Sequence, residues 1–177
     1  MKRSLALLAF LTAGNVVAAQ LTVAVTLAMD AGTLSDLAAA VALMNDAVPS
    51  RLVVRGIPLR AGWEKTPYWQ APAEKQRVLK AELTAAWADF ARQLPTAGAE
   101  IDPAFFRRYR ITDAPVFVLE GDGTNEGCEG NPPAVIVRGN VTAGYAVREM
   151  RAALTDEPGA DSSLKAVLRR LEGLNLW

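Results

Sequence analysis

Side chains that could act as nucleophiles or hold metals are scarce in this chain. Its 177 residues include no histidine and a single cysteine, Cys128. Without histidine, Ser-His-Asp and Cys-His nucleophile pairs, imidazole metal sites and the usual proton shuttle near neutral pH are excluded. One cysteine permits neither an internal disulfide nor a CxxC redox pair nor a cysteine zinc cluster. Thiol chemistry within the chain therefore depends on Cys128 alone.

Cys128 lies in a stretch, residues 120–133, that is rich in Gly, Asp, Glu and Asn. From Asp122 onward, polar side chains fall at the first, third and fifth positions and Gly127 at the sixth, as in a calcium-binding loop. Pro133 stands at the twelfth position, where such a loop needs a bidentate glutamate, so we expect no metal there. Cys128 could form a mixed disulfide with another protein. Because no nearby histidine or cation activates it as a thiolate, we expect a free thiol without a role.

Three charged residues beside predicted turns are further candidates. Asp102 and Asp113 could pair as carboxylates, but Asp102 precedes Pro103 as a helix N-cap would, and Asp113 is typical of a turn. Arg55 follows a short strand and could bind a carboxylate of a partner, although a solvated charge at a strand end explains it equally well. We therefore predict no catalytic residue, no cofactor and no metal site.

The overall composition predicts one globular domain that does not bind nucleic acid. The 19 basic residues balance 19 acidic ones, so no whole-chain positive field is available for counterion release. Half of the residues are apolar and 21% are charged, which is typical of folded proteins. A chain of this length favours a single core.

The N-terminus has the layout of a cleavable signal peptide. Lys2 and Arg3 precede the short apolar run Ser4–Leu11, and the small residues Val17 and Ala19 fit the pockets of signal peptidase. The apolar run is well short of the ~20 residues that span a bilayer. We expect cleavage after Ala19, export to the periplasm and no stable membrane span in the mature protein.

The pattern after the signal peptide predicts a strand, a helix and a second strand. Leu21–Leu27 is a near-continuous β-prone run. A capping box at Thr33 and Asp36 starts the following helix, which ends near Asn45. The short strand Arg51–Gly56 completes a series whose length implies a right-handed parallel crossover.

The second half of the chain mixes helices with two further strands. A long helix is expected over residues 74–94, and a brief extended piece at 99–101 precedes a short helix capped by Asp102. The strands 116–119 and 134–138 can pair as antiparallel neighbours, and a core helix follows them.

A break in the pattern sets the last predicted helix, from Ser162, apart from the rest. Residues 157–161 read Glu-Pro-Gly-Ala-Asp, which is typical of a hinge. We therefore divide the chain into a signal peptide (1–19), a main domain (20–156) and a C-terminal helical extension (157–177).

The order of these elements resembles an α/β fold of the thioredoxin-like kind, a mixed four-stranded sheet flanked by helices. Leu52–Gly56, Ile101-Asp102-Pro103 with Phe106, and Ile111 with Ala114–Val118 resemble the TrbC family of type-F conjugative-transfer pilus-assembly proteins. Gly139-Asn140-Val141 before the last core helix fits the same pattern, and the resemblance covers roughly residues 21–154.

The resemblance implies a periplasmic role in assembling an F-type conjugative pilus, part of a type IV secretion system, together with a transfer protein of the TraW kind. The sequence departs from the family at one place. The family commonly has a Ser-Met-Pro-like turn after the first strand, whereas this chain reads Ala28-Met29-Asp30.

In redox-active proteins of this fold a CxxC pair occupies the start of the helix after the first strand, where the helix dipole stabilises a thiolate. Ala28-Met29-Asp30 stands there instead, so no sulfur nucleophile is present. By the same resemblance Pro115 is a cis-proline beside this helix start, although it could simply begin a strand in the trans form. We hypothesise that Met29, Asp30, Ala114 and Pro115 border a partner-binding groove.

Trp63, Tyr68 and Trp69 form a second candidate partner surface. They lie in a proline-rich stretch, and aromatic side chains commonly anchor interfaces. A long loop packed over its own core explains them equally well.

Together these observations favour a non-enzymatic, periplasmic assembly factor that binds another transfer protein. Two alternatives remain open at this point. One is a single-thiol envelope redox protein that uses Cys128, and the other is a redox-inactive, thioredoxin-like envelope chaperone unrelated to conjugation.

Overall fold

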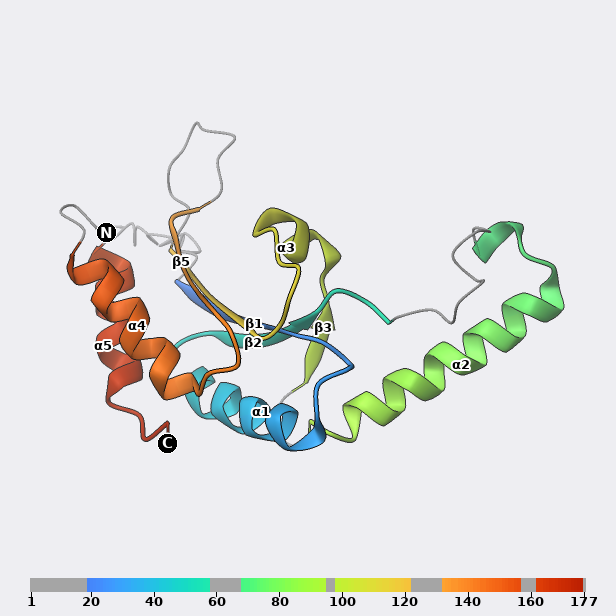
Figure 1. Ribbon diagram of the computed structural model, residues 1–177, viewed down its shortest axis with the longest axis horizontal. Helices are drawn as coiled ribbons and strands as arrows, with labels where there is room; N and C mark the ends of the chain where they lie inside the picture. The colour runs from blue at the N-terminus through green and yellow to red at the C-terminus, as the bar shows by residue number, and fades with distance from the viewer. Residues whose placement is uncertain (1–18, 58–67, 95–97, 122–131, 157–161, 177) are drawn as a thin grey trace, which may run out of the picture.

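Figure 1 shows the computed structural model of the chain, in which a five-stranded mixed sheet carries helices on both faces. The structure describes residues 19–57, 68–94, 98–121, 132–156 and 162–176. The strands are β1 (Gln20–Val25), β2 (Ser50–Val54), β3 (Ala99–Ile101), β4 (Val116–Glu120) and β5 (Ala134–Arg138). The helices are α1 (Ala31–Asn45), the 3-10 helix η1 (Tyr68–Gln70), α2 (Ala73–Ala91), α3 (Pro103–Arg108), α4 (Ala143–Thr155) and α5 (Ser162–Glu172).

The strand order is β3-β2-β1-β4-β5, with β1 in the middle. β1 runs parallel to β2, and β2 runs parallel to β3, whereas β4 is antiparallel to both β1 and β5. The predicted parallel unit around α1 and the predicted antiparallel pair β4–β5 are both confirmed. The α/β class is confirmed as well.

The sheet has five strands, so the expected count of four was wrong. The additional strand is β3, where Ala99, Glu100 and Ile101 pair with Leu52, Val53 and Val54 of β2. Three residues are too few to show the alternating pattern of a strand. The open edge of β2 supplies the hydrogen-bonding partners that make this short segment a strand.

Side chains from the two faces of the sheet form two separate cores. The larger lies against α1, α4 and α5 and includes Leu21, Val23 and Val25 of β1. The smaller lies against α3 and includes Ala24. Successive side chains of a strand point to opposite faces, so β1 contributes to both cores, and all of Leu21–Val25 is 0% exposed.

The start of α1 differs from the sequence prediction. Asp30, and not Thr33, is the N-cap, and its carboxylate accepts a hydrogen bond from the Thr33 backbone N–H at 2.8 Å. Ala31 and Gly32 are already helical, so Thr33 lies within the first turn. The turn after β1, in which the Met29 N–H donates to the Thr26 carbonyl, directly precedes Asp30, so α1 begins three residues earlier than predicted.

α2 extends away from the sheet, as Figure 1 shows. It covers Ala73–Ala91, close to the predicted 74–94, and its buried side chains are Leu79 and Phe90. Phe90 belongs to the larger core, so α2 is attached to the sheet near its C-terminal end. Within the described part of the chain, no helix combines the length and the apolar character needed to cross a bilayer.

α5 packs on the same core as the main domain. Leu164, Leu168 and Leu171 are buried there, and Arg151 of α4 forms an ion pair with Glu172 of α5 at 2.6 Å. The predicted boundary at residues 157–161 lies outside the described residues, so the division of the chain stays a prediction.

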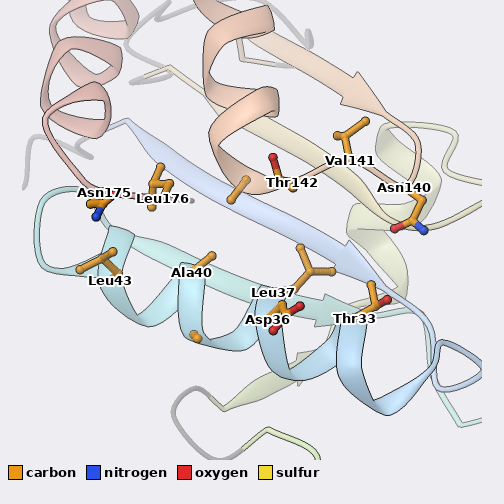
Figure 2. A pocket seen from close by; sticks show the side chains of 12 residues that line it. Thr33, Asp36, Leu37, Ala40, Leu43, Asn140, Val141, Thr142, Asn175 and Leu176 are labelled. Carbon is orange, nitrogen blue, oxygen red and sulfur yellow. The ribbon is translucent and has the colours of Figure 1, made fainter.

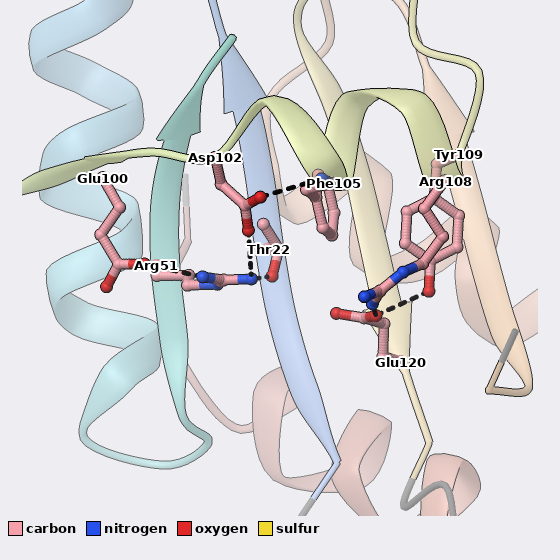
Figure 3. Close-up of polar contacts among 8 residues, drawn as sticks. All are labelled: Thr22, Arg51, Glu100, Asp102, Phe105, Arg108, Tyr109 and Glu120. Carbon is pink, nitrogen blue, oxygen red and sulfur yellow. Dashed lines mark hydrogen bonds and ion pairs between the residues drawn. The ribbon is translucent and has the colours of Figure 1, made fainter. Parts of the chain in front are cut away.

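A polar cluster fixes α3 on the sheet. Asp102 caps α3 by accepting from the Phe105 N–H at 2.9 Å, and its other oxygen lies 3.3 Å from a guanidinium nitrogen of Arg51 on β2 (Figure 3). Arg51 also pairs with Glu100 at 2.7 Å and donates to Thr22, which is fully buried in β1. This cluster therefore joins β1, β2, β3 and α3, and it confirms Asp102 as a helix cap.

We expect Asp102→Ala to lower the free energy of unfolding by about 1–2 kcal/mol, because the variant loses a helix cap. Asp102→Asn keeps a capping oxygen and loses only the partly exposed ion pair, so we expect it to lower the free energy of unfolding by less than about 1 kcal/mol. Urea denaturation followed by circular dichroism measures both. Asp89→Ala, in an exposed pair with Arg92 on α2, is the control, with an expected change within about 0.5 kcal/mol. Equal effects of Asp102→Ala and Asp89→Ala would contradict the capping role.

Candidate functional site

The carboxyl ends of β1 and β2 and the loop before β4 meet at one edge of the sheet. Ala24 of β1 is paired with Val116 of β4, so the antiparallel register brings Pro115 beside Val25. The Ala114–Pro115 bond is cis, which confirms the isomer that the fold resemblance predicted. Pro115 is buried, whereas Ala114 is half-buried.

A cavity of about 610 Å³ opens at this edge. We call it the strand-end groove, and its lining comes from the end of β1, the end of β2, Phe106 of α3 and the loop before β4: Val25, Thr26, Val54, Arg55, Gly56, Ile57, Phe106, Thr112, Asp113 and Ala114. Gly56 has a φ of +155°, and a Cβ built on it would meet nothing within 4 Å. The backbone conformation and not crowding therefore favours glycine here.

The four predicted groove residues lie around this edge but do not line one cavity. Ala114 lines the strand-end groove, whereas Met29, Asp30 and Pro115 do not. Met29 is half-buried against the larger core, and Asp30 is exposed as the cap of α1. Hydrogen bonds from the Thr33 side chain and backbone lower the pKa of the Asp30 carboxyl below its usual range.

Arg55 contributes the cation of the strand-end groove. Its guanidinium donates a hydrogen bond to the Ile111 carbonyl and lies 5.2 Å from the centre of the Phe106 ring. Among the described residues no carboxylate lies within ion-pair distance of it. The sequence left Arg55 open between a partner contact and a solvated charge at a strand end. Arg55 is exposed in the structure, so the solvated charge fits, and the partner contact stays a prediction. Its position directly after a strand was the available signal.

A buried carboxylate joins α3 to β4. Glu120 is 8% exposed and accepts hydrogen bonds from the Tyr109 hydroxyl at 2.6 Å and from Arg108 at 3.2 Å (Figure 3). Burial of the phenol, together with the Glu120 charge beside it, raises the pKa of Tyr109 well above its ordinary value of 10. Sequence reasoning missed this pair because nothing in a local pattern marks Glu120 as buried.

The other candidates from the sequence are spread over the chain. Trp69 in η1 is 77% exposed, and Tyr68 begins the same turn. Trp63, Cys128, residues 122–131 of the Gly/Asp-rich stretch and nearly all of the signal peptide lie outside the described residues. Asp113 accepts a hydrogen bond from Thr112 at 2.9 Å, and Asp102 has its own partners on α3 and β2. In the described ranges no three His, Cys, Asp or Glu side chains gather as a metal site would need.

A second hollow of about 530 Å³ lies between α1, the start of α4 and the C-terminal Asn175 and Leu176 (Figure 2). Alanine, leucine and valine make up more than half of its lining residues, and Asp36 is the one ionisable residue among them. This lining offers apolar contact area but no group suited to catalysis.

The Tyr109–Glu120 contact gives stability a defined pH dependence. The pKa of Tyr109 is higher in the folded protein than in the unfolded chain. Above pH 10 the hydroxyl ionises in the unfolded chain but keeps its proton in the folded protein, so the stability that Tyr109 contributes is lost as the pH rises beyond 10. Tyr109→Phe costs about 1–3 kcal/mol at pH 7, since the hydrogen bond to a charged group is removed. Between about pH 10 and 11.5 the difference in the free energy of unfolding between the wild type and Tyr109→Phe narrows by up to about 1.4 kcal/mol per pH unit. Urea titrations at both ends of this range measure it, and a difference that does not change with pH would contradict the assignment.

Comparison with known proteins shows the family of this chain. A model of the family described as the type-F conjugative transfer system pilin assembly protein, TrbC, matches residues 23–150. No curated protein and no solved structure gives a significant match. The matched residues run from β1 into α4 and include every residue that lines the strand-end groove. Because the match covers more than half of the chain, this protein belongs to the type-F conjugative transfer pilin assembly family.

Proposed function

We propose that this protein is a non-enzymatic assembly factor for an F-type conjugative pilus, and that it acts in the periplasm by binding another transfer protein of the TraW kind. Its family is one of pilin assembly proteins. The observation that carries the binding role is the strand-end groove, an open cavity beside Ala114 at the carboxyl ends of two parallel strands.

The chemistry of the groove lining favours binding over catalysis. Its residues offer a guanidinium, a carboxylate, two threonine hydroxyls and apolar side chains, and none is a cysteine. Thr112 donates to Asp113, but both residues are exposed to water, where an ordinary carboxylate is too weak a base to activate a hydroxyl. With no histidine anywhere in the chain, the usual base for such a nucleophile is missing as well.

The size of the groove suits a segment of a partner. A cavity of about 610 Å³ falls within the roughly 300–1,000 Å³ of typical ligand sites. Its accessible lining includes the partly exposed Ile57 and Ala114 beside the polar side chains of Thr26, Arg55 and Thr112, so a peptide with apolar and polar side chains fits it.

The exported form is expected to begin at Gln20. β1 starts at this residue, so removal of residues 1–19 leaves every strand of the sheet complete. N-terminal sequencing and intact mass of the protein isolated from the periplasm test the cleavage site. A periplasmic protein that still starts at Met1 would contradict the proposed export route.

A bulky side chain in the groove should abolish partner binding. Thr26 is exposed and lines the groove, so Thr26→Trp fills the cavity without disturbing either core. We expect at least a tenfold loss of affinity for the TraW-like protein of the same transfer system, measured by calorimetry with purified proteins. Thr84→Trp, at an exposed position on α2, is the matched control and keeps wild-type affinity. If Thr26→Trp binds as well as Thr84→Trp, the groove is not the binding site.

One further variant separates this proposal from the single-thiol alternative. Cys128→Ser removes the one thiol of the chain and should leave both partner binding and pilus assembly unchanged. A stable mixed disulfide in cells that is lost in Cys128→Ser together with activity would instead favour a redox role.

A further inference from the structure

We infer that the strand-end groove takes an extended segment of the partner that carries a carboxylate side chain, and that Arg55 binds this carboxylate. The inference rests on the proposed function and adds the chemistry of the bound segment. Three features of the described residues support it: a guanidinium that is held in place with no carboxylate of theirs beside it, a second guanidinium on the same loop, and a groove lining with a single acidic residue.

Arg55 is ordered by contacts that leave its charge intact. The Ile111 carbonyl accepts one of its five N–H donors, and the Phe106 ring lies 5.2 Å from the guanidinium carbon. Neither contact supplies a negative charge, and no described carboxylate is within ion-pair distance. An arginine fixed in this way has lost much of its conformational freedom before binding, so less entropy is lost when a carboxylate arrives. Its remaining donors suit a bidentate carboxylate.

Further cations neighbour the groove lining. Arg107 follows Phe106 in the chain and Arg110 precedes Thr112 by two residues; both are exposed, and neither has a carboxylate within ion-pair distance among the described residues. Arg138 donates to the Tyr109 carbonyl at 2.9 Å, which places its guanidinium against the same loop that Arg55 holds. Asp113 is the one acidic residue in the groove lining. The described residues around the groove therefore carry a net positive charge, in a chain whose formal net charge is zero.

Other arginines on this side of the sheet serve the structure. Arg51 is paired with Glu100 and Asp102, and Arg108 is paired with Glu120. Their charges are balanced within the fold, so they add little to the field outside it. Arg55 and Arg138 differ because they donate to backbone carbonyls, which carry no net charge. This difference marks the groove rim as the place where an acidic partner segment is attracted.

The charge of the chain favours a peptide over a nucleic acid. A phosphate backbone is held by a large positive field, and a formal net charge of zero supplies none. Val25, Val54 and Phe106 of the lining are buried in the cores, whereas Ile57 and Ala114 are partly exposed and offer apolar contact in the same groove as Arg55. A glutamate or aspartate flanked by apolar residues fits this arrangement.

The test uses a fluorescein-labelled peptide, acetyl-Ser-Val-Ser-Val-Glu-Val-Ser-Val-Ser, and a second peptide with Gln in place of Glu. Fluorescence anisotropy with the purified full-length mature protein measures both affinities. We expect the Glu peptide to bind at least tenfold more tightly than the Gln peptide, and this preference to disappear in Arg55→Gln. Arg77→Gln, in an exposed ion pair with Glu74 on α2, is the control and keeps the preference.

A second variant keeps the test decisive if Arg55→Gln fails to fold. Arg110 is exposed, and its side chain forms no hydrogen bond or ion pair with the described residues, so we expect Arg110→Gln to preserve the structure. We expect it to weaken binding of the Glu peptide two- to fivefold and to reduce the dependence of affinity on salt concentration, because one rim charge is lost.

Three outcomes of the peptide experiment would overturn the inference. They are equal affinities for the Glu and Gln peptides, unchanged affinity for the Glu peptide in both arginine variants, and tighter binding to vesicles of anionic lipid than to the Glu peptide. If the TraW-like protein binds the wild type but is indifferent to Arg55→Gln and Arg110→Gln, this inference fails and the proposed function stands. If the Glu peptide binds through Arg55 but the TraW-like protein does not bind at all, the proposed function fails and the groove chemistry stands.

Discussion

The arrangement of this molecule depends on the burial of β1 on both faces. Residues Leu21–Val25 have no exposed surface, so layers must cover both sides of the strand, and partner strands must satisfy both of its edges. α1, α4 and α5 cover one face, and α3 covers the other. β2 pairs with one edge and β4 with the other. The parallel pairing with β2 brings two carboxyl ends to one edge, and the antiparallel pairing with β4 brings Pro115 to the same place.

The arginines on the α3 side of the sheet are of two kinds, which differ in whether a carboxylate balances their charge. Arg51 and Arg108 end on carboxylates, and those ion pairs hold α3, β2, β3 and β4 together. Arg55 and Arg138 end on backbone carbonyls of the loop before β4, so they order that loop without losing their charge. Because a backbone carbonyl carries no net charge, these two hydrogen bonds stabilise the loop and leave both guanidiniums positive.

Membership of a pilin assembly family fits a scaffold whose strand-end corner lacks a reactive group. In the thioredoxin-like fold that this chain resembles, reactive thiols stand at the start of the helix after the first strand. Here the acidic cap Asp30 begins α1, and the neighbouring Met29 packs inward. The same corner has a cavity next to Ala114. Trp69 of η1 is 77% exposed, and α2 extends away from the sheet.

The sequence by itself determined the elements and the excluded chemistry. The apolar run that predicted the first strand and the cap Asp102 are local patterns; β1 (Gln20–Val25) covers most of the predicted region, and Asp102 caps α3. The lack of histidine and the single cysteine follow from composition alone.

Tertiary structure decided the cap of α1, the fifth strand and the site. The capping box predicted a helix start at Thr33, whereas the turn after β1 makes Asp30 the N-cap. β3 is a strand only because β2 offers a free edge. The guanidinium of Arg55 meets a carbonyl 56 residues later in the chain, and Met29 turns away from the cavity that Ala114 lines. Local periodicity records which face of an element is apolar, but contacts between distant segments depend on how the layers pack, which no single stretch of sequence encodes.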